Sequence, residues 1–354
     1  MGQKIGFSIG GLLISALILI VVFFLGVQSQ TSDVEILNGQ ITGKTRVHDS
    51  YQRSYSCNCT TTGTGSNART SCQTCYEDRY TVTWDAQSTV GSFRIDSEDS
   101  GSRRVYNKPN PPLYDSINPG DPAARQHTYT NYIKAAPDSL FSPAAKELRE
   151  KYASQIPAYP SELHDIFKIN RVIPVGVTVP NLAEWNLKLS TMLRVIGPRN
   201  QANAVVVLVN TDDPNYLYAL RDAWVNGKKN DVVVVIGASK FPERATWVGV
   251  LAFTEREIFQ VQLRDAVLAL PSLTADGVVG AIANSIEGSY VRRSMEKFEY
   301  LAAEIDPPLW LTSTTTALII AAYAGFWYVL RRQSVPRSAY RGLSAKFNSR
   351  FYNR

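Results

Sequence analysis

Two valine-rich runs, Ala204–Val209 and Val232–Ile236, constrain the fold more than any other feature of the chain. Neither contains a polar residue and both are too short for a helix, which is typical of strands covered on both faces. Between them, Pro214–Asn226 places apolar residues at helical spacing, behind Asp212 and Asp213, whose position favours a helix start. The sequence therefore predicts a strand, a helix and a strand that form one right-handed crossover in a mostly parallel sheet.

This crossover belongs to a larger predicted α/β domain, residues 173–305. A turn through Pro242–Arg244 would join its last two strands as a hairpin. Before the domain, residues 129–172 are predicted to form a proline-rich linker with one helix. The further predicted elements are the linker helix Pro143–Gln155, the strand Thr246–Ala252 and the helices Asn181–Ile196, Thr254–Leu268 and Thr274–Leu301.

Two uncharged apolar stretches, Ile5–Val27 and Leu309–Leu330, flank the rest of the chain. Each is long enough to cross about 30 Å of hydrocarbon as a helix. The first also resembles a signal peptide, but its apolar core is long and no small-x-small cleavage site precedes Gln28, which favours an uncleaved anchor. We therefore expect two transmembrane helices, residues 5–27 and 309–330.

The positive charge of the chain is concentrated in the C-terminal tail. Residues 331–354 hold seven basic residues and no acidic one, whereas the net charge of the whole chain is +6. Basic tails beside a membrane span lie in the cytoplasm and attract anionic lipid headgroups. We therefore expect a double-pass protein in contact with the bilayer, with residues 1–4 and 331–354 cytoplasmic and residues 28–308 extracytoplasmic. Because the part between the spans has no basic stripe, we expect no binding to nucleic acid.

Residues 28–128 are rich in Ser, Thr, Gly and Tyr and contain short alternating runs, which predict a small β module. Val34–Leu37 and Gln40–Val47 would form a hairpin around a turn at Asn38-Gly39. Tyr80–Trp84 and Ser92–Ile95 would add further strands. Because apolar residues are few, the core would be thin, and a covalent or metal staple is expected.

All four cysteines of the chain, Cys57, Cys59, Cys72 and Cys75, lie in this module. Two close pairs joined by a flexible loop could hold one tetrahedral zinc ion. An even number of cysteines outside the cytoplasm fits two disulfides equally well. A bond between Cys57 and Cys59 would be strained, so disulfides would run from this pair to Cys72 and Cys75. Either staple is structural.

The segment Leu220–Gly237 resembles part of the TPM domain family. Its helix ends in Ala-Trp-Val-Asn-Gly and is followed by Lys228, Lys229, an asparagine and a valine strand. The resemblance covers Val179–Leu301 and implies an α/β domain outside the cytoplasm beside a membrane anchor. Members of the family are phosphatases, bind calcium, or act in the assembly or repair of membrane complexes. Where the family has a glycine after the asparagine, this chain has Asp231. The N-terminal half, with a His-Asp-Ser-Tyr run at residues 48–51 and a Cys-x-Cys run at residues 57–59, is similar to uncharacterised phage and bacterial membrane proteins.

Asp212, Asp213 and Asp231 are the candidate ligands for a hard cation, calcium or magnesium, near the strand ends. The alternative is that Asp212 and Asp213 cap a helix and Asp231 is an exposed turn residue. The sequence shows no Ser/His/Asp or Cys/His order that would indicate a catalytic triad or an activated nucleophile.

The predicted fold class is α+β or α/β, with two transmembrane helices around a cysteine-stapled β module and a TPM-like α/β sandwich. Three functions fit this organisation. The first is a non-enzymatic interaction or assembly protein with a membrane-protein partner. The second is a metal-dependent, phosphatase-like hydrolase that uses the aspartates. The third is a virus-encoded envelope protein that acts on a host membrane.

Overall fold

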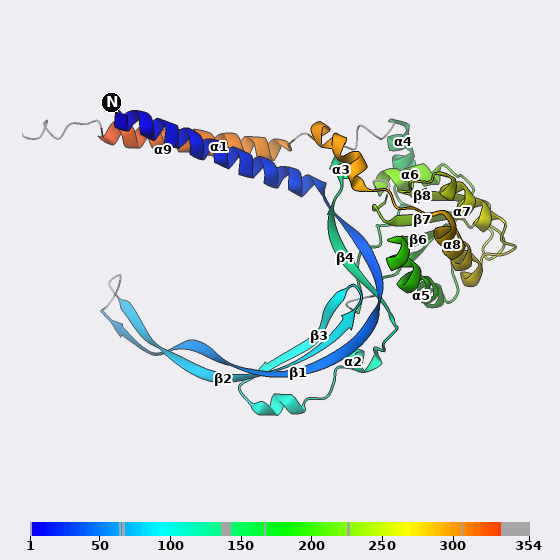
Figure 1. Cartoon of the computed structure of the whole chain (residues 1–354), viewed down its shortest axis with the longest axis horizontal. Coiled ribbons are helices and arrows are strands. Elements are labelled where there is room, and N and C mark those ends of the chain that lie inside the picture. Colours follow the sequence, from blue (N-terminus) through cyan, green and yellow to red (C-terminus); the bar gives the residue numbers. More distant parts are fainter. Residues whose placement is uncertain are drawn as a thin grey trace, which may run out of the picture. The chain divides into compact units, whose positions relative to one another are not determined.

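The computed structural model describes residues 2–63, 65, 68–135, 143–165, 168–224, 227–305 and 307–333. It divides into two compact units (Figure 1). One consists of Met1–Ser32 with Tyr300–Arg354, and the other is Asp33–Glu299. The basic tail predicted to contact anionic lipid lies outside the described residues, apart from its first three.

The first unit contains the helices α1 (Gly2–Thr31) and α9 (Leu309–Gln333). They pack side by side, and Gly26 lies so close to Leu311 that a Cβ atom at this position would collide with it. Within the described residues, Ile14–Thr31 is long and apolar enough to cross a membrane, whereas the apolar part of α9, Leu309–Gly325, is shorter. A second membrane span is therefore not clearly shown.

The second unit begins with a four-stranded sheet in the order β3-β2-β1-β4. β1 forms one long antiparallel hairpin with β2, and β3 extends the hairpin on the β2 side. One face is covered by the short helices η2 and α2, which pack around Trp84 and Val82. The bounds are β1 (Ser32–Thr62), β2 (Arg69–Ser88), β3 (Gly91–Ser100), η2 (Arg103–Asn107), α2 (Pro112–Ser116) and β4 (Pro122–Thr130).

The predicted turn at Asn38-Gly39 is wrong, because β1 runs through both residues without interruption. The Asn38 side chain does not serve a turn. Its amide nitrogen donates to the carbonyl oxygen of Ala202 at 3.1 Å, and its oxygen accepts from Arg171 at 2.5 Å. Contacts with the α/β domain thus take the place of the local turn that the Asn-Gly dipeptide favours.

The second sheet has the order β5-β6-β7-β8. β5, β6 and β7 are parallel, and β8 returns antiparallel to β7. One face packs against α5, α7 and α8, and the other against α4 and α6. The bounds are α3 (Tyr132–Ala135), α4 (Pro143–Lys151), β5 (Val172–Val175), α5 (Leu182–Asn200), β6 (Asn203–Val209), α6 (Tyr216–Ala223), β7 (Asp231–Gly237), β8 (Trp247–Ala252), α7 (Ile258–Leu268) and α8 (Ala275–Ser289).

The strand–helix–strand prediction is confirmed as β6, α6 and β7, and every residue of both strands is buried. The long helix predicted for Thr274–Leu301 is wrong in its second half. α8 ends at Ser289, and Tyr290 is extended, with its ring 5.2 Å from that of Phe259 in the core. The chain then forms the 3-10 helix η4 (Met295–Glu304).

Candidate functional site

The cysteines form two disulfides, Cys57–Cys75 and Cys59–Cys72, and none is free. The predicted zinc site is therefore wrong, because all four sulfur atoms are bonded to one another and none is a thiolate ligand. Bridging across the two pairs, the disulfide alternative, is confirmed. Disulfides and an N-terminal apolar helix together indicate a membrane-anchored or secreted domain.

This pairing predicts a simple outcome by mass spectrometry. The full chain, denatured without reductant, should take up no thiol-alkylating reagent, and after reduction it should take up four, one for each cysteine. Its native mass should show no bound zinc. Alkylation before reduction, or one zinc per chain, would contradict the two disulfides.

The three predicted cation ligands do not come together. Asp231 pairs with Asn203 at the start of the parallel strands, whereas Asp212 and Asp213 follow the far end of β6. Seven-residue strands separate these ends by about 20 Å. Within the described residues, no group of three or more His, Cys, Asp or Glu side chains could hold a metal ion. The expectation of calcium or magnesium is corrected accordingly.

Asp212 and Asp213 instead accept hydrogen bonds from nearby side chains. Asp212 accepts a hydrogen bond from Ser239 at 2.6 Å, which lowers the pKa of its carboxyl group. Asp213 accepts from Lys151 at 2.8 Å and from Tyr152, and these two contacts hold the pKa of Asp213 well below its usual range. Asp213 also accepts from the backbone N–H of Asn215 at 2.9 Å, close to the start of α6. Asp213 alone fits the helix-start alternative, because Asp212 bonds Ser239 and the N-cap of α6 is Asn215. The turn alternative for Asp231 is wrong, since this residue is 1% exposed and begins β7.

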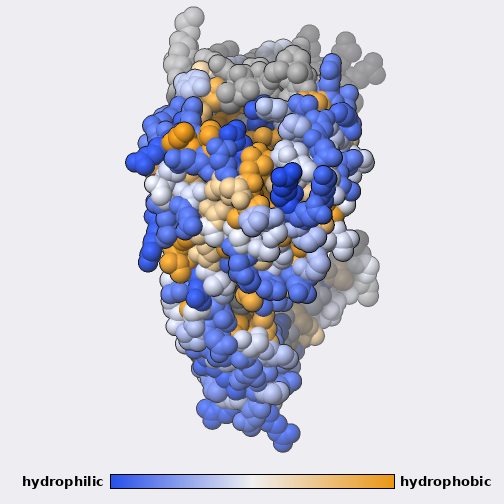
Figure 2. All heavy atoms as spheres, turned by 90° about the vertical axis from the view of Figure 1, so that its right-hand side faces the viewer, coloured by the Kyte–Doolittle hydropathy of each residue, from blue (hydrophilic) through white to orange (hydrophobic). Residues whose placement is uncertain are grey.

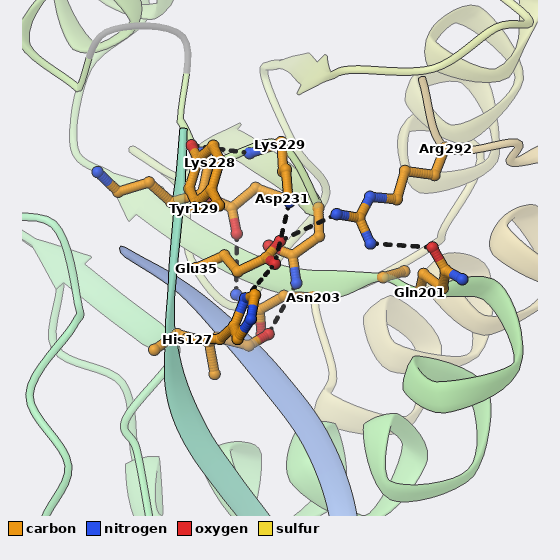
Figure 3. A network of polar contacts seen from close by, with 12 residues as sticks. Glu35, His127, Tyr129, Gln201, Asn203, Lys228, Lys229, Asp231 and Arg292 are labelled. Atoms are coloured by element: carbon orange, nitrogen blue, oxygen red, sulfur yellow. Dashed lines mark hydrogen bonds and ion pairs between the residues drawn. The ribbon is translucent and has the colours of Figure 1, made fainter. Parts of the chain in front are cut away.

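Asp231 belongs to a larger set of polar side chains that join the β1–β4 sheet to the α/β domain, which we call the junction network (Figure 3). None of its basic groups comes from the same strand as the carboxylates that they contact. Its members are Asp33, Glu35, Asn38, His127, Tyr129, Tyr159, Arg171, Asn203, Lys228, Lys229, Asp231 and Arg292.

Glu35 contacts three basic side chains of the junction network, and its own side chain is 2% exposed. One carboxylate oxygen lies 2.9 Å from His127 Nδ1 and 3.3 Å from Lys229 Nζ. The other lies 3.2 Å from Arg292 Nη2, and Arg292 donates from Nη1 to Gln201 at 2.9 Å (Figure 3). One buried carboxylate thus connects β1, β4, the loop before β7 and the segment after α8.

Asp33 makes a second connection two residues earlier on β1. It accepts from Lys228 Nζ at 2.6 Å and from the Asn131 amide at 2.8 Å. Burial alone would raise the pKa of Asp33, but these hydrogen bonds outweigh it and the pKa is lowered. The neighbouring ammonium of Lys229 lies 4.5 Å from the ring centroid of Tyr129. The two consecutive lysines are thereby fixed against β1 and β4.

A third connection between the two sheets runs through the side-chain amides of Asn203 and Asn38. Asp231 accepts from Asn203 Nδ2 at 2.9 Å, from Tyr159 at 3.1 Å and from the Lys228 backbone N–H at 2.7 Å. Asn203 in turn accepts from Arg171 Nε at 2.9 Å. Burial raises the pKa of Asp231 to about 6, because these donors only partly replace water. Arg171 extends the connection to Asn38 on β1.

The junction network has a structural role: it holds the β1–β4 sheet against the α/β domain. Asp33, Glu35 and Asp231 each meet several donors of the chain, so their oxygen atoms are already occupied. Sequence reasoning flagged Asp231 but missed Glu35 and Arg171. Two consecutive lysines before a fully buried strand were the available signal for acidic partners nearby.

The other feature with a distinctive chemistry is the distal ribbon, Tyr51–Thr62 of β1 with Arg69–Arg79 of β2. β3 pairs with β2 only from Tyr80 onward, and β4 is nine residues long and lies against the first part of β1. The ribbon thus extends beyond both neighbouring strands, as Figure 1 shows. At about 3.3 Å per residue, its eleven β2 residues span about 35 Å.

The distal ribbon exposes tyrosines and holds no aliphatic residue. Tyr51 and Tyr55 are each 45% exposed and lie on one face, because they are four residues apart on β1 and side chains alternate between the two faces of a strand. Tyr76, on the opposite face, is 66% exposed. Tyr and Arg are enriched in protein interfaces, and Tyr, Ser and Asn in antibody paratopes.

No protein-family model, curated protein or solved structure matches this chain, so the resemblance to the TPM family stays an expectation from sequence and the function is argued from geometry.

Proposed function

We propose that this chain is a membrane-anchored extracytoplasmic interaction protein that contacts its protein partner through the distal ribbon. The observation that carries the proposal is the exposure of Tyr51, Tyr55 and Tyr76 on a ribbon with which no third strand pairs among the described residues. At its base, the Tyr51 hydroxyl donates to Asp99 of β3 at 2.6 Å. A solvated two-stranded ribbon is marginally stable, so the two disulfides near its tip favour a function that needs it ordered.

Other surfaces support the proposal less well. On the side of the α/β domain that carries α7 and α8, hydrophobic residues lie in small groups among hydrophilic ones (Figure 2). Single exposed apolar residues such as Ile258 and Val261 are ordinary on a protein surface. The alternative hydrolase would need a cation at aspartates that the fold separates, and we do not propose it.

In this proposal both α1 and α9 are membrane spans, with the Asp33–Glu299 unit outside the cytoplasm. Support comes from the uncharged stretches of both helices and from the disulfides, which persist in oxidising compartments. The junction network would then hold the base of the ribbon in a fixed orientation to the α/β domain.

The test places a photo-crosslinking amino acid in the full chain, in its native membrane, at Tyr51, Tyr55 or Tyr76. The matched control is Tyr218 on α6, which is 44% exposed. We expect one shared adduct from the three ribbon positions and none from position 218. Replacing the three ribbon tyrosines by serine should reduce co-purification of that partner by at least tenfold, because exposed aromatics contribute most to interface energy. Unchanged co-purification would refute the ribbon as the contact surface.

A further inference from the structure

A pocket of about 390 Å³ lies between the β1–β4 sheet and helix α5. Its volume is in the range of small-molecule sites in proteins. The wall from the sheet includes Asn38 and Ala123, and the wall from α5 includes Leu187 and Ser190. Neither the disulfides nor the distal ribbon reaches it, and it shares only Asn38 and Arg171 with the junction network.

Arg171 lines this pocket and is 2% exposed. Its guanidinium donates to the side-chain oxygens of Asn203, Ser190 and Asn38 at 2.9, 3.1 and 2.5 Å, and to the Ile169 carbonyl at 3.5 Å. All four acceptors are uncharged. The acidic groups that act electrostatically on Arg171 among the described residues are Tyr159 and Asp231, and the Asp231 carboxylate is joined to Arg171 through the amide of Asn203.

The Arg171 guanidinium is charged and has one N–H donor that none of the four acceptors uses. Burial lowers the pKa of Arg171 to about 9, so the group is still protonated near neutral pH. A guanidinium has five N–H donors, and four are used by the acceptors named above. A buried cation without a direct anionic partner is costly, and an anion in the pocket would offset that cost.

The rim of the pocket holds two basic side chains. His164 and Lys168 line it, with side chains 47% and 49% exposed. Both lie near Asp165, at 3.8 and 3.2 Å, which holds them at the edge. Asp121 is the one acidic residue among the described residues of the lining, and its carboxylate accepts from the Asn118 backbone N–H at 2.8 Å. The permanent positive charges of the lining are therefore Arg171 and Lys168, and Lys168 is already paired with Asp165.

The remaining wall is mostly apolar. Ile117 and Ala123 are buried, whereas Leu187 is 60% exposed at the mouth. A ligand that fits must therefore present one anionic end and a short apolar body. A planar carboxylate suits the single guanidinium better than a phosphate dianion, which usually takes several donors.

We propose that this pocket binds a small amphipathic carboxylate, with its anionic group at Arg171 and Lys168 and its apolar body against Ile117, Ala123 and Leu187.

The test is ligand-observed fluorine NMR on the full chain in lipid nanodiscs, with empty nanodiscs as a blank. 4-Fluorophenylacetate is the probe, and 4-fluorophenylacetamide is its neutral counterpart. We expect saturable binding of the carboxylate and at least tenfold weaker binding of the amide, because only the carboxylate forms charge-assisted hydrogen bonds. Equal binding of the two, or no saturable binding of the carboxylate, would overturn the proposal.

Variants locate the binding without disturbing the buried arginine. Leu187→Trp should block the mouth and abolish binding, whereas Val195→Trp, at a 40% exposed position of the same helix outside the lining, should not. Lys168→Gln should weaken binding several-fold, and Lys240→Gln, which removes the same charge elsewhere, should leave it unchanged. Binding that survives Leu187→Trp would place the ligand elsewhere. Binding of 4-fluorophenyl phosphate in preference to the carboxylate would refute the assigned ligand class.

Discussion

Replacing Glu35 by Gln is expected to lower the free energy of unfolding of the Asp33–Glu299 unit by about 3 kcal/mol. Glutamine has the same shape but no charge, so Lys229 and Arg292 would lose their common anion while their side chains stay 17% and 19% exposed. Removing one member of a buried ion pair costs more than the pair contributes, since the remaining charge is left without a partner. Urea unfolding followed by tryptophan fluorescence measures the difference.

Glu257→Gln is the matched control, because it makes the same chemical change on the surface. The Glu257 side chain is 86% exposed and lies 3.9 Å from Arg293. Exposed pairs of this kind contribute less than about 1 kcal/mol, so its stability should stay close to that of the unmodified chain. Equal losses in the two variants, or no loss in Glu35→Gln, would show that the junction network does not fasten the two sheets.

The α/β domain was predictable because its signals are local. Strands buried on both faces are uninterrupted apolar runs, and β6 and β7 consist almost entirely of valine and other aliphatic residues. The hairpin return to β8 and the helix between β6 and β7 were likewise marked by turn and start residues close in sequence. Such features need no knowledge of distant parts of the chain.

The sequence-based predictions fail where contacts between residues far apart in the sequence determine the structure. Asn38-Gly39 favours a turn by itself, but the Asn38 amide donates a hydrogen bond to the carbonyl oxygen of Ala202 in the α/β domain, 164 residues further along the chain. Cysteine spacing fits zinc and disulfides equally, and only the pairing of the sulfur atoms in the folded ribbon, Cys57 with Cys75 and Cys59 with Cys72, distinguishes them. Glu35 was missed as part of the site, because its partner Arg292 is 257 residues away.

Asp231 should make the stability of the chain depend on pH in an unusual direction. Burial raises the pKa of Asp231 from 3.8 to about 6 in the folded protein. Between these values the folded state binds a proton that the unfolded state does not bind. The contribution of Asp231 to the free energy of unfolding is therefore largest below about pH 4 and is lost as the pH rises through about 6.

The size of this effect follows from the shift in pKa, which corresponds to at most about 3 kcal/mol. The measurement is the free energy of unfolding of the unmodified chain and of Asp231→Asn at several pH values between 4 and 7.5. Other titrating groups are the same in both proteins, so they cancel in the difference. We expect the unmodified chain to lose stability relative to Asp231→Asn as the pH rises across this range.

Asp213→Asn provides a control of opposite sign. Hydrogen bonds from Lys151 and Tyr152 lower the pKa of Asp213, so its stabilising contribution is present near neutral pH and is lost on acidification through the lowered value. Asp213 is partly exposed and solvent screens its charge, so the change should be small. If the difference between the unmodified chain and Asp231→Asn does not change with pH, the Asp231 carboxyl is not held in the low-dielectric contact between the two sheets that the junction network requires.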